Sequence, residues 1–309
     1  MSKNILVTGG LGFIGSKIID NFLKKKYNVI IIDNFFSNVK KNSKCKIFKA
    51  DITNIKSLEK IKLKNIYAIY HLAGQSSGPR SADDPELDAR LNIIGTINML
   101  NIASKNKVKK FIFSSTFTVY GDPVISKQKM SENDNCKPKS MYGISKKSCE
   151  EYVKSLCDKN NIKWTILRLF NVYGPGQNIN RTDQGIVGIF INLIKNKNTI
   201  EITGSLDRFK DLIYIDDVVK AFILSLKKKS DNQIFNVGTG KKTTISNLLK
   251  NINNIFEPNK KRKIKVLSAP HGEIKGAYAD IYKIKKNLNF LPKTNLKEGL
   301  IKFRKHLGL

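Results

Sequence analysis

A glycine-rich loop lies near the start of the chain, between a predicted strand and a predicted helix that begins at Phe13. Gly10, Gly12 and Gly15 fit the pattern GxGxxG, and Gly9, Gly12 and Gly15 also fit the wider pattern GxxGxxG. Glycines at these positions allow a tight turn and a close approach of the backbone to a pyrophosphate. The N–H groups and the dipole of the following helix then favour an anion. The loop therefore predicts a strand–helix–strand unit that holds a dinucleotide.

Asp33 ends the second predicted strand, at roughly the 20-residue spacing expected after such a loop. A carboxylate there accepts hydrogen bonds from both ribose hydroxyls and repels a 2′-phosphate, so Asp33 favours NAD over NADP. Asn34 follows it directly. Asp51 and Ile52 come after the third predicted strand and are candidate contacts of the adenine.

Strand-like and helix-like segments alternate through the first half of the chain. We predict strands at 4–8, 28–32, 46–49, 68–71, 110–114 and 163–167, and helices at 13–26, 55–61, 85–105 and 141–159. This alternation is typical of a parallel sheet with helices on both faces. Several of the strands are almost continuously apolar, as buried parallel strands are.

The alternation becomes less regular after Asn171. Residues 174–184 are rich in Gly, Pro, Asn and Gln and predict a loop. Further predicted elements are a strand at 234–237 and helices at 187–195, 215–227, 245–256 and 296–305. We therefore expect an α/β fold, a doubly wound parallel sheet with a smaller, mixed α/β C-terminal lobe. The expected division is a cofactor domain of residues 1–171, to which 212–243 return, and a substrate lobe of residues 172–211 and 244–309.

Tyr142 and Lys146 stand four residues apart on a predicted helix, so their side chains share a face. A tyrosine is a poor base at neutral pH, because its ordinary pKa is about 10. A lysine ammonium about 5 Å away favours the phenolate by roughly 3 kcal/mol at an effective dielectric constant of 20. With a positively charged nicotinamide ring nearby, we expect a lowered pKa of Tyr142, which would take a hydroxyl proton as hydride leaves the same carbon. Thr116, at the end of a predicted strand, is expected to hold that hydroxyl in line.

The net charge of the chain is +31, an excess that can indicate nucleic acid or an anionic membrane surface as a partner. However, 49 of the 56 basic residues are lysines, and they are spread along the whole chain. Phosphate- and base-reading surfaces tend to use clustered arginines. We therefore interpret most of the charge as a bias in the amino-acid composition of the source organism, and expect no specific nucleic-acid partner. No apolar stretch reaches the ~20 residues of a membrane span, so we expect no membrane contact.

The four cysteines form no CxxC pair, and the three histidines are scattered. We therefore expect reduced thiols and no metal site. The few residues before the first predicted strand leave no room for a leader peptide, so we expect a cytoplasmic protein.

Together these residues resemble the extended short-chain dehydrogenase/reductase family, in its NAD-dependent epimerase/dehydratase branch. The resemblance rests on motifs at 8–15, 33, 51–52, 71–74, 92–96, 113–121, 142–146, 168–177, 211–217 and 278–280. It implies a Rossmann-like domain with tightly held NAD and a C-terminal lobe that binds a nucleoside diphosphate. It also implies a homodimer, commonly paired through the helices at 85–105 and 141–159.

The resemblance also implies roles for individual residues. The cofactor contacts are expected at Gly9, Gly12, Phe13, Ile14, Gly15, Asp33, Asn34, Asp51, Ile52, Leu72, Ala73, Gly74, Asn92, Ser114, Tyr142 and Lys146. The substrate contacts are expected at Gln75, Thr116, Thr118, Tyr142, Asn171, Arg208 and Lys210.

The two residues after Thr116 discriminate between members of the branch. The similar 4,6-dehydratases carry Asp-Glu there, and the nucleotide-sugar decarboxylases usually carry Glu at the second position. Here the residues are Phe117 and Thr118, a pattern most similar to the 4-epimerases. The sequence therefore predicts oxidation at C4 of a UDP-sugar, rotation of the 4-keto sugar and reduction on its other face, in a reaction of cell-surface polysaccharide synthesis.

Other interpretations stay open. A 2-epimerase, a 4-keto-sugar reductase or a dehydratase would use the same fold. A non-catalytic NAD- or RNA-binding protein would fit the basic charge, but would have no need of an activated tyrosine.

The chain also departs from the family pattern. The usual arginine directly before Asp211 is Lys210 here, with Arg208 two residues earlier, and only arginine offers a planar fork to phosphate. A usual lysine after the His71 motif is replaced in Gln75-Ser76, and residues 270–273 lack a usual arginine. Arg80 and Arg181 are candidate replacements as anion contacts.

Overall fold

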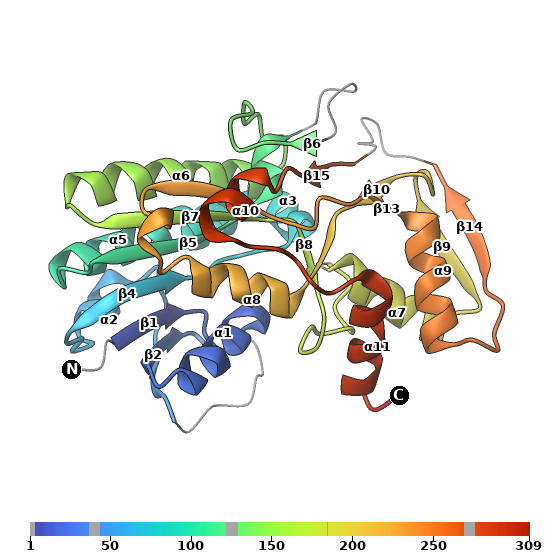
Figure 1. Cartoon of the computed structure of the whole chain (residues 1–309), viewed down its shortest axis with the longest axis horizontal. Coiled ribbons are helices and arrows are strands. Elements are labelled where there is room, and N and C mark those ends of the chain that lie inside the picture. The colour runs from blue at the N-terminus through green and yellow to red at the C-terminus, as the bar shows by residue number, and fades with distance from the viewer. Residues whose placement is uncertain (1–3, 37–43, 122–128, 184, 269–275) are drawn as a thin grey trace.

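The fold is taken from a computed structural model, which describes residues 4–36, 44–121, 129–183, 185–268 and 276–309 (Figure 1). A seven-stranded sheet forms its centre, and every pairing within it is parallel. In spatial order the strands are β12 (Gln233–Val237), β7 (Lys163–Leu169), β5 (Lys110–Thr116), β4 (Ile66–His71), β1 (Asn4–Thr8), β2 (Asn28–Asp33) and β3 (Lys46–Lys49).

The strand order reverses at β1, which pairs with β2 on one side and with β4 on the other. In open parallel sheets, ligands bind beyond the carboxyl ends of the strands at such a reversal. Thr8 and His71, the last residues of β1 and β4, are paired in register, so this edge of the sheet is where a site is expected.

Alternating side chains of each strand point to opposite faces of the sheet and build two apolar layers. Ile5 and Val7 belong to one layer, and Leu6 to the other. The first layer packs on α1 (Phe13–Lys24) and α8 (Ile215–Leu224), and the second on α5 (Gly95–Lys105) and α6 (Met141–Lys159). The doubly wound fold expected from the sequence is confirmed.

The predicted helix at 85–105 is not one regular helix. It consists of α4 (Pro85–Ala89), a π-helical segment (Arg90–Ile94) and α5. Such π-helical segments are frequent at functional sites, and Asn92 lies in this one. Smaller elements of this part of the chain are α2 (Ile55–Glu59), α3 (Gly78–Asp83) and a 3₁₀ turn (Phe117–Tyr120).

A second group of elements lies beyond the sheet, on the right of Figure 1. It contains α7 (Ile186–Asn196), α9 (Ile245–Phe256), α11 (Leu296–His306) and the paired strands β9 (Thr199–Thr203) and β14 (Lys263–Leu267). Val187, Leu248 and Leu300 of its helices belong to the same apolar cluster as Ile5 and Val7 of the sheet. These helices thus share one continuous apolar cluster with one face of the sheet.

Three pairs of short strands lie outside the central sheet: β8 (Asn171–Tyr173) with β11 (Leu212–Tyr214), β10 (Phe209–Lys210) with β13 (Thr243–Thr244), and β6 (Lys129–Met130) with β15 (Tyr278–Ala279). The remaining elements are a 3₁₀ turn (Lys228–Ser230) and α10 (Tyr282–Leu288). Strand β12, at the edge of the seven-stranded sheet, and helix α8 fall within 212–243, while the predicted division into two domains stays a prediction.

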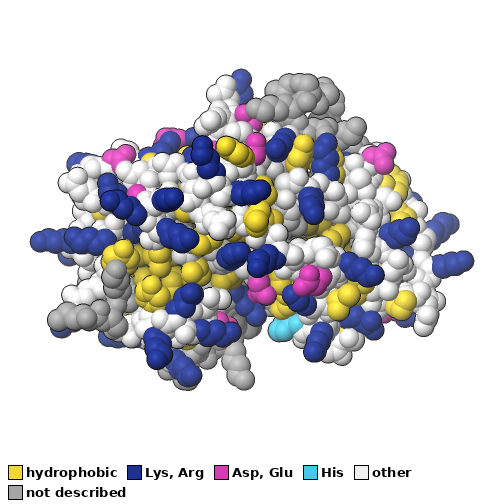
Figure 2. All heavy atoms as spheres, viewed as in Figure 1, with side chains coloured by type: hydrophobic (Ala, Val, Ile, Leu, Met, Phe, Trp, Pro, Cys, Tyr) yellow, Lys and Arg dark blue, Asp and Glu magenta, His cyan; other side chains and the backbone are white. Residues whose placement is uncertain are grey.

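The basic side chains are dispersed on the face drawn in Figure 2, where Lys and Arg alternate with uncharged and apolar groups. None of the helices in the described ranges has the length and hydrophobicity that crossing a bilayer requires. No group of three or more His, Cys, Asp or Glu in the described part of the chain is arranged to hold a metal ion.

Candidate functional site

The loop after β1 leaves no room for side chains at two of its glycines. Gly9 has φ of +65°, and a Cβ there would lie 2.8 Å from the backbone nitrogen of Ala73. A Cβ on Gly15 would collide with the carbonyl oxygen of Gly9. Gly12 caps α1 without a side-chain hydrogen bond, and the first turn of this helix carries no acidic residue. The helix N-terminus, which includes Phe13 and Ile14, thus fits an anionic diphosphate.

Asp33 lies at the carboxyl end of β2, beside this loop, and is 7% exposed. Its Oδ2 accepts from Leu11 N at 2.9 Å, and its Oδ1 accepts from Phe35 N at 2.7 Å. An ionised carboxylate has about four acceptor positions, so both oxygens can also accept from ribose hydroxyls. The residues present therefore fit a dinucleotide without a 2′-phosphate.

Three other predicted cofactor residues surround this edge. Asn34 Oδ1 accepts from Phe36 N at 3.0 Å, and Asp51 Oδ1 accepts from Thr53 N at 2.8 Å. Ile52 is buried. Their local bonds shape the turns after β2 and β3, and their contacts with the cofactor stay predictions.

His71 ties the loop after β4 to the loop after β1. Its two ring nitrogens lie 2.7 Å from Thr8 Oγ1 and 3.1 Å from Thr96 Oγ1, and Ala73 N donates to Thr8 Oγ1 at 3.2 Å. Burial, together with the positive charge of Lys146, lowers the pKa of His71 to about 3. A neutral imidazole thus fixes the segment of Leu72, Ala73 and Gly74 against the glycine loop.

Tyr142 of α6 and Thr116 of β5 lie in contact, and Lys146 lies one turn further along α6, against the Phe113 ring. Ser140 caps α6 by accepting from Gly143 N at 3.0 Å, so the helix begins at the next residue, Met141. Tyr142 is hydrogen bonded to Thr116 at the end of β5, and Lys146 Nζ lies 4.2 Å from the centre of the Phe113 ring.

The expected lowering of the pKa of Tyr142 is not produced by the chain's own groups. Burial raises this pKa, and the hydrogen bond to Thr116 only partly opposes the rise. Burial also lowers the pKa of Lys146, against the attraction of Cys149, Glu150 and Asp88. The reason is that desolvation disfavours both charged forms at once, so the expected activation depends on a further positive charge.

Thr118 and Ser114 flank Thr116 in sequence. Thr118 donates to Thr116 Oγ1 from its hydroxyl at 3.1 Å and from its backbone N at 3.2 Å. Ser114 lies in β5, paired with Leu167 of β7. Phe117 turns the other way and stacks on Phe170, with ring centres 5.1 Å apart.

Gln75, a predicted substrate contact, is engaged inside the chain. Its Nε2 donates to Ser77 O at 2.8 Å and to Asp88 Oδ1 at 3.2 Å, while Oε1 accepts from Ser77 N. Only 7% of the residue is exposed. Its contact with a substrate stays a prediction, because the structure shows its amide holding the turn before α3.

The predicted diphosphate contacts lie further along the chain. Asn171 Nδ2 donates to Asp211 O at 3.1 Å, which puts Asn171 next to the residue that follows Lys210. The Arg208 guanidinium donates to the carbonyls of Ser205 and Thr203, and thus holds its own turn. Arg181 forms a two-bond pair with Asp183, and Arg80 lies over the Phe36 ring. Residues 270–273 fall outside the described ranges.

Sequence reasoning missed two buried carboxylates, Glu150 on α6 and Asp88 on α4. Glu150 forms two hydrogen bonds with Arg168, at 2.9 and 2.7 Å, and accepts from Ser115 Oγ at 2.6 Å. Asp88 accepts from Asn92 Nδ2 at 3.0 Å. A usable signal was their spacing, because each lies four residues from a motif residue, Lys146 or Asn92, on the same helical face.

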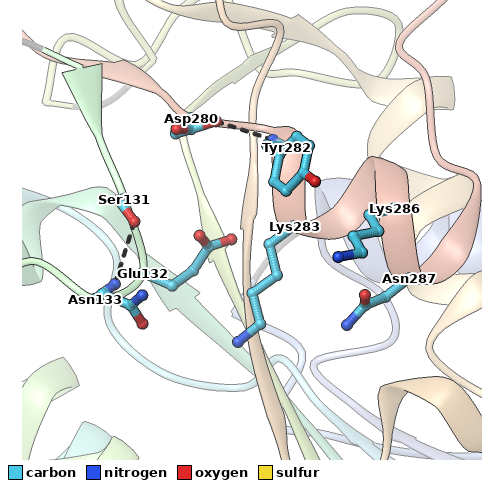
Figure 3. A pocket seen from close by; sticks show the side chains of 8 residues that line it. All are labelled: Ser131, Glu132, Asn133, Asp280, Tyr282, Lys283, Lys286 and Asn287. Atoms are coloured by element: carbon cyan, nitrogen blue, oxygen red, sulfur yellow. Dashed lines mark hydrogen bonds between the residues drawn. The ribbon is translucent and has the colours of Figure 1, made fainter.

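A cavity of about 310 Å³ lies elsewhere, between the segment after β6 and the start of α10 (Figure 3). Figure 3 shows Glu132 and Lys283 on its two sides, and Asp280 accepting from Tyr282 N at 2.9 Å. None of the site residues predicted from the sequence lines this cavity, so we assign it no part in the candidate site.

Comparisons with known proteins agree with this geometry. A sequence model described as the NAD dependent epimerase/dehydratase family matches residues 5–238. The chain is 37% identical to a putative UDP-glucose 4-epimerase of Methanocaldococcus jannaschii, over 96% of this chain and 95% of that protein. It is 31% identical to the dTDP-4-dehydro-6-deoxyglucose reductase of Escherichia coli, over 99% and 98%.

Among solved structures, the crystal structure of a Thermotoga maritima UDP-glucose 4-epimerase with UDP-glucose superposes with a TM-score of 0.91. Its sequence is 36% identical, and the match covers 99% of this chain and 98% of that chain. The chain therefore belongs to the NAD-dependent epimerase/dehydratase family of nucleotide-sugar enzymes, whose cofactor is NAD.

Proposed function

We propose that this protein is an NAD-dependent 4-epimerase of a UDP-sugar. The observation that carries the proposal is the convergence of Thr116, Tyr142 and Lys146 at a site where Phe117 and Thr118 follow the threonine. Phe117 packs in an apolar cluster, and Thr118 donates its hydroxyl to Thr116. Neither position therefore carries the acid that a dehydratase or, at the second position, a decarboxylase would use. The relatives named as UDP-glucose 4-epimerases support the same activity.

In this mechanism the residues of the chain handle the proton. Thr116 orients the C4 hydroxyl, and Tyr142 removes its proton and, once the 4-keto sugar has rotated, returns the proton to the C4 oxygen. Lys146 favours the phenolate by its charge. Bound NAD supplies the hydride acceptor and donor. The glycine loop with Phe13 and Ile14, Asp33 and the 72–74 segment would hold it.

We further propose that residues 172–211 and 244–309 hold the nucleotide diphosphate, with Asn171 and Lys210 as contacts. The hydrogen bond from Asn171 Nδ2 to Asp211 O supports this proposal, because Asp211 directly follows Lys210 in the chain. Arg208 donates to Ser205 O and so holds the turn that precedes Lys210.

A homodimer is part of the proposal. Ile94, Met141, Ile144 and Tyr152 are 42–46% exposed, and all lie on the π-helical segment or on α6. An apolar surface on these helices fits the pairing that the family resemblance implies.

The test is incubation of the purified protein, without added cofactor, with UDP-, GDP-, CDP- and dTDP-sugars, followed by proton NMR of the anomeric signals. Conversion of one UDP-sugar to its C4 epimer is the expected result. A reaction that requires added NADH and a 4-keto sugar would instead identify a reductase, the activity named for the Escherichia coli relative.

A further inference from the structure

Asp88 is a buried carboxylate that the proposed mechanism does not use. It lies in α4, and only 1% of it is exposed. Its Oδ1 accepts from Asn92 Nδ2 at 3.0 Å and from Gln75 Nε2 at 3.2 Å. No ion pair joins it to a lysine or arginine within the described ranges. A carboxylate is rarely buried this deeply without a cation nearby.

The bonds of Asp88 connect the cofactor loop to the catalytic helix. Asn92 Oδ1 accepts from Gln75 N at 3.0 Å, and Asn92 Nδ2 also donates to Ser145 Oγ at 3.1 Å. Ser145 in turn donates to the carbonyl oxygen of Tyr142 at 3.1 Å. Because Asn92 Oδ1 fills the space beside Gly74, a side chain at position 74 would break the connection.

The cation whose charge Asp88 affects is Lys146, which is only 7% exposed. The titratable groups that face it are His71 from β4, Cys149 and Glu150 from its own helix, and Asp88 from α4. The ring of Phe113 in β5 covers it as well.

These neighbours do not contribute equally. His71 is neutral, and burial raises the pKa of the Cys149 thiol, so that it also stays neutral. Glu150 is already compensated by its two bonds to Arg168. Asp88 is therefore the facing carboxylate whose charge no other cation matches.

We propose that Asp88 is a positioning residue of the reaction, whose carboxylate is the counter-charge of the buried Lys146 ammonium and the anchor of Gln75 and Asn92. The proposal rests on the proposed function, and it explains why the amide of Gln75 turns inward.

The sign of the effect follows from the charge. The negative charge of Asp88 raises the pKa of both Lys146 and Tyr142. Removing it lowers both values. In the mechanism above, the acid limb of the pH profile of kcat/KM reports deprotonation of Tyr142, and the alkaline limb reports deprotonation of Lys146. Both limbs therefore move to lower pH, whereas a purely structural loss would reduce activity without moving them.

The experiment compares Asp88→Asn with Asp84→Ala in the NAD-bound protein. Asparagine keeps the shape of aspartate and one acceptor oxygen, so the bonds from Gln75 and Asn92 can persist without the charge. Asp84 is exposed at the start of the same helix, where it accepts from Leu87 N, so Asp84→Ala removes a charge and a helix cap but no counter-charge. Asp88→Ser serves as a second neutral variant.

Two readouts are taken. Ultraviolet difference absorption of tyrosinate, with the Tyr142→Phe variant as the blank, gives the titration of Tyr142 without any substrate. The pH profile of UDP-sugar turnover gives both limbs. We expect Asp88→Asn and Asp88→Ser to move the tyrosinate midpoint and both limbs of the pH profile to lower pH. The turnover measured on the acid limb, divided by the turnover measured on the alkaline limb, should then rise several-fold relative to the wild-type protein.

If folded Asp88→Asn or Asp88→Ser has the same tyrosinate midpoint as the wild-type protein, the proposal is overturned. It is also overturned if Asp84→Ala moves this midpoint by the same amount. If the wild-type protein converts no UDP-sugar, the proposed function fails, and the tyrosinate midpoint alone still decides the role of Asp88.

Discussion

In the loop after β1 the backbone itself forms the site, whereas around Lys210 long side chains are expected to do so. Gly9, Gly12 and Gly15 shape the loop that leads into the N-terminus of α1, in a geometry that fixed backbone angles and close contacts enforce. Lys210 lies in a strand of two residues that pairs with Thr243, more than thirty residues later. A site made of backbone is specified by a local motif, but a site made of distant side chains depends on the whole fold.

The largest effect is expected at Tyr142, the proposed general base. Tyr142→Phe should keep NAD and lower turnover of the UDP-sugar about 1,000-fold, because the general base is lost while the ring still packs. Turnover and bound NAD are measured on the same preparation. Tyr152→Phe, an exposed tyrosine of the same helix, is the matched control. Near-normal turnover of Tyr142→Phe would refute the assigned mechanism.

The next largest effect concerns the backbone site. In Gly15→Ala, the new Cβ meets the Gly9 carbonyl and lies 2.8 Å from Gly10 Cα, so the loop must shift. We expect NAD affinity to fall about 100-fold, or roughly 2.7 kcal/mol, as measured by calorimetric titration. Gly78→Ala is the control, since nothing lies within 4 Å of its Cβ position. Equal affinity of the two variants would show that the loop does not depend on close backbone contact.

A smaller effect is expected from the side-chain site. Lys210→Met should raise the KM for the UDP-sugar about tenfold, the loss expected for one charge-assisted hydrogen bond, and leave NAD affinity unchanged. Lys241→Met removes an exposed charge from the same region and serves as the control. If both variants raise KM alike, Lys210 acts only through the general positive field, and the diphosphate contact lies elsewhere.

The parallel sheet was predictable because its strands carry continuous apolar runs. The predicted limits of β1, β3, α6 and α9 agree with the structure, and Ser140 and Thr244 supply the caps that begin the two helices. The π-helical segment was not predictable, because one widened turn at Arg90–Ile94 hardly alters the helical period. The two-residue strands were missed because their partners are distant in sequence, as with Met130 and Ala279.

The candidate site divides in the same way. Tyr142, Lys146 and Thr116 stand in motifs, and the hydrogen bond of Tyr142 to Thr116 is consistent with their predicted roles, which stay predictions. The inward turn of Gln75 could not be predicted, since it depends on Asp88, thirteen residues away on another element. The lowered pKa expected for Tyr142 depends on Lys146 and on bound NAD. In the chain alone, desolvation of Tyr142 and Lys146 works against it, and the sequence does not show how deeply the two groups are buried.

The apolar cluster shared by the sheet and the helices α7, α9 and α11 bears on how the molecule admits its substrate. Ile5 and Val7 of the sheet and Ile191 and Phe303 of these helices are fully buried members of it. A hinged opening between the two regions would expose such side chains to water, at about 25 cal/mol for each Å² uncovered. We therefore expect the two regions to move and unfold as one cooperative unit rather than to open about a hinge.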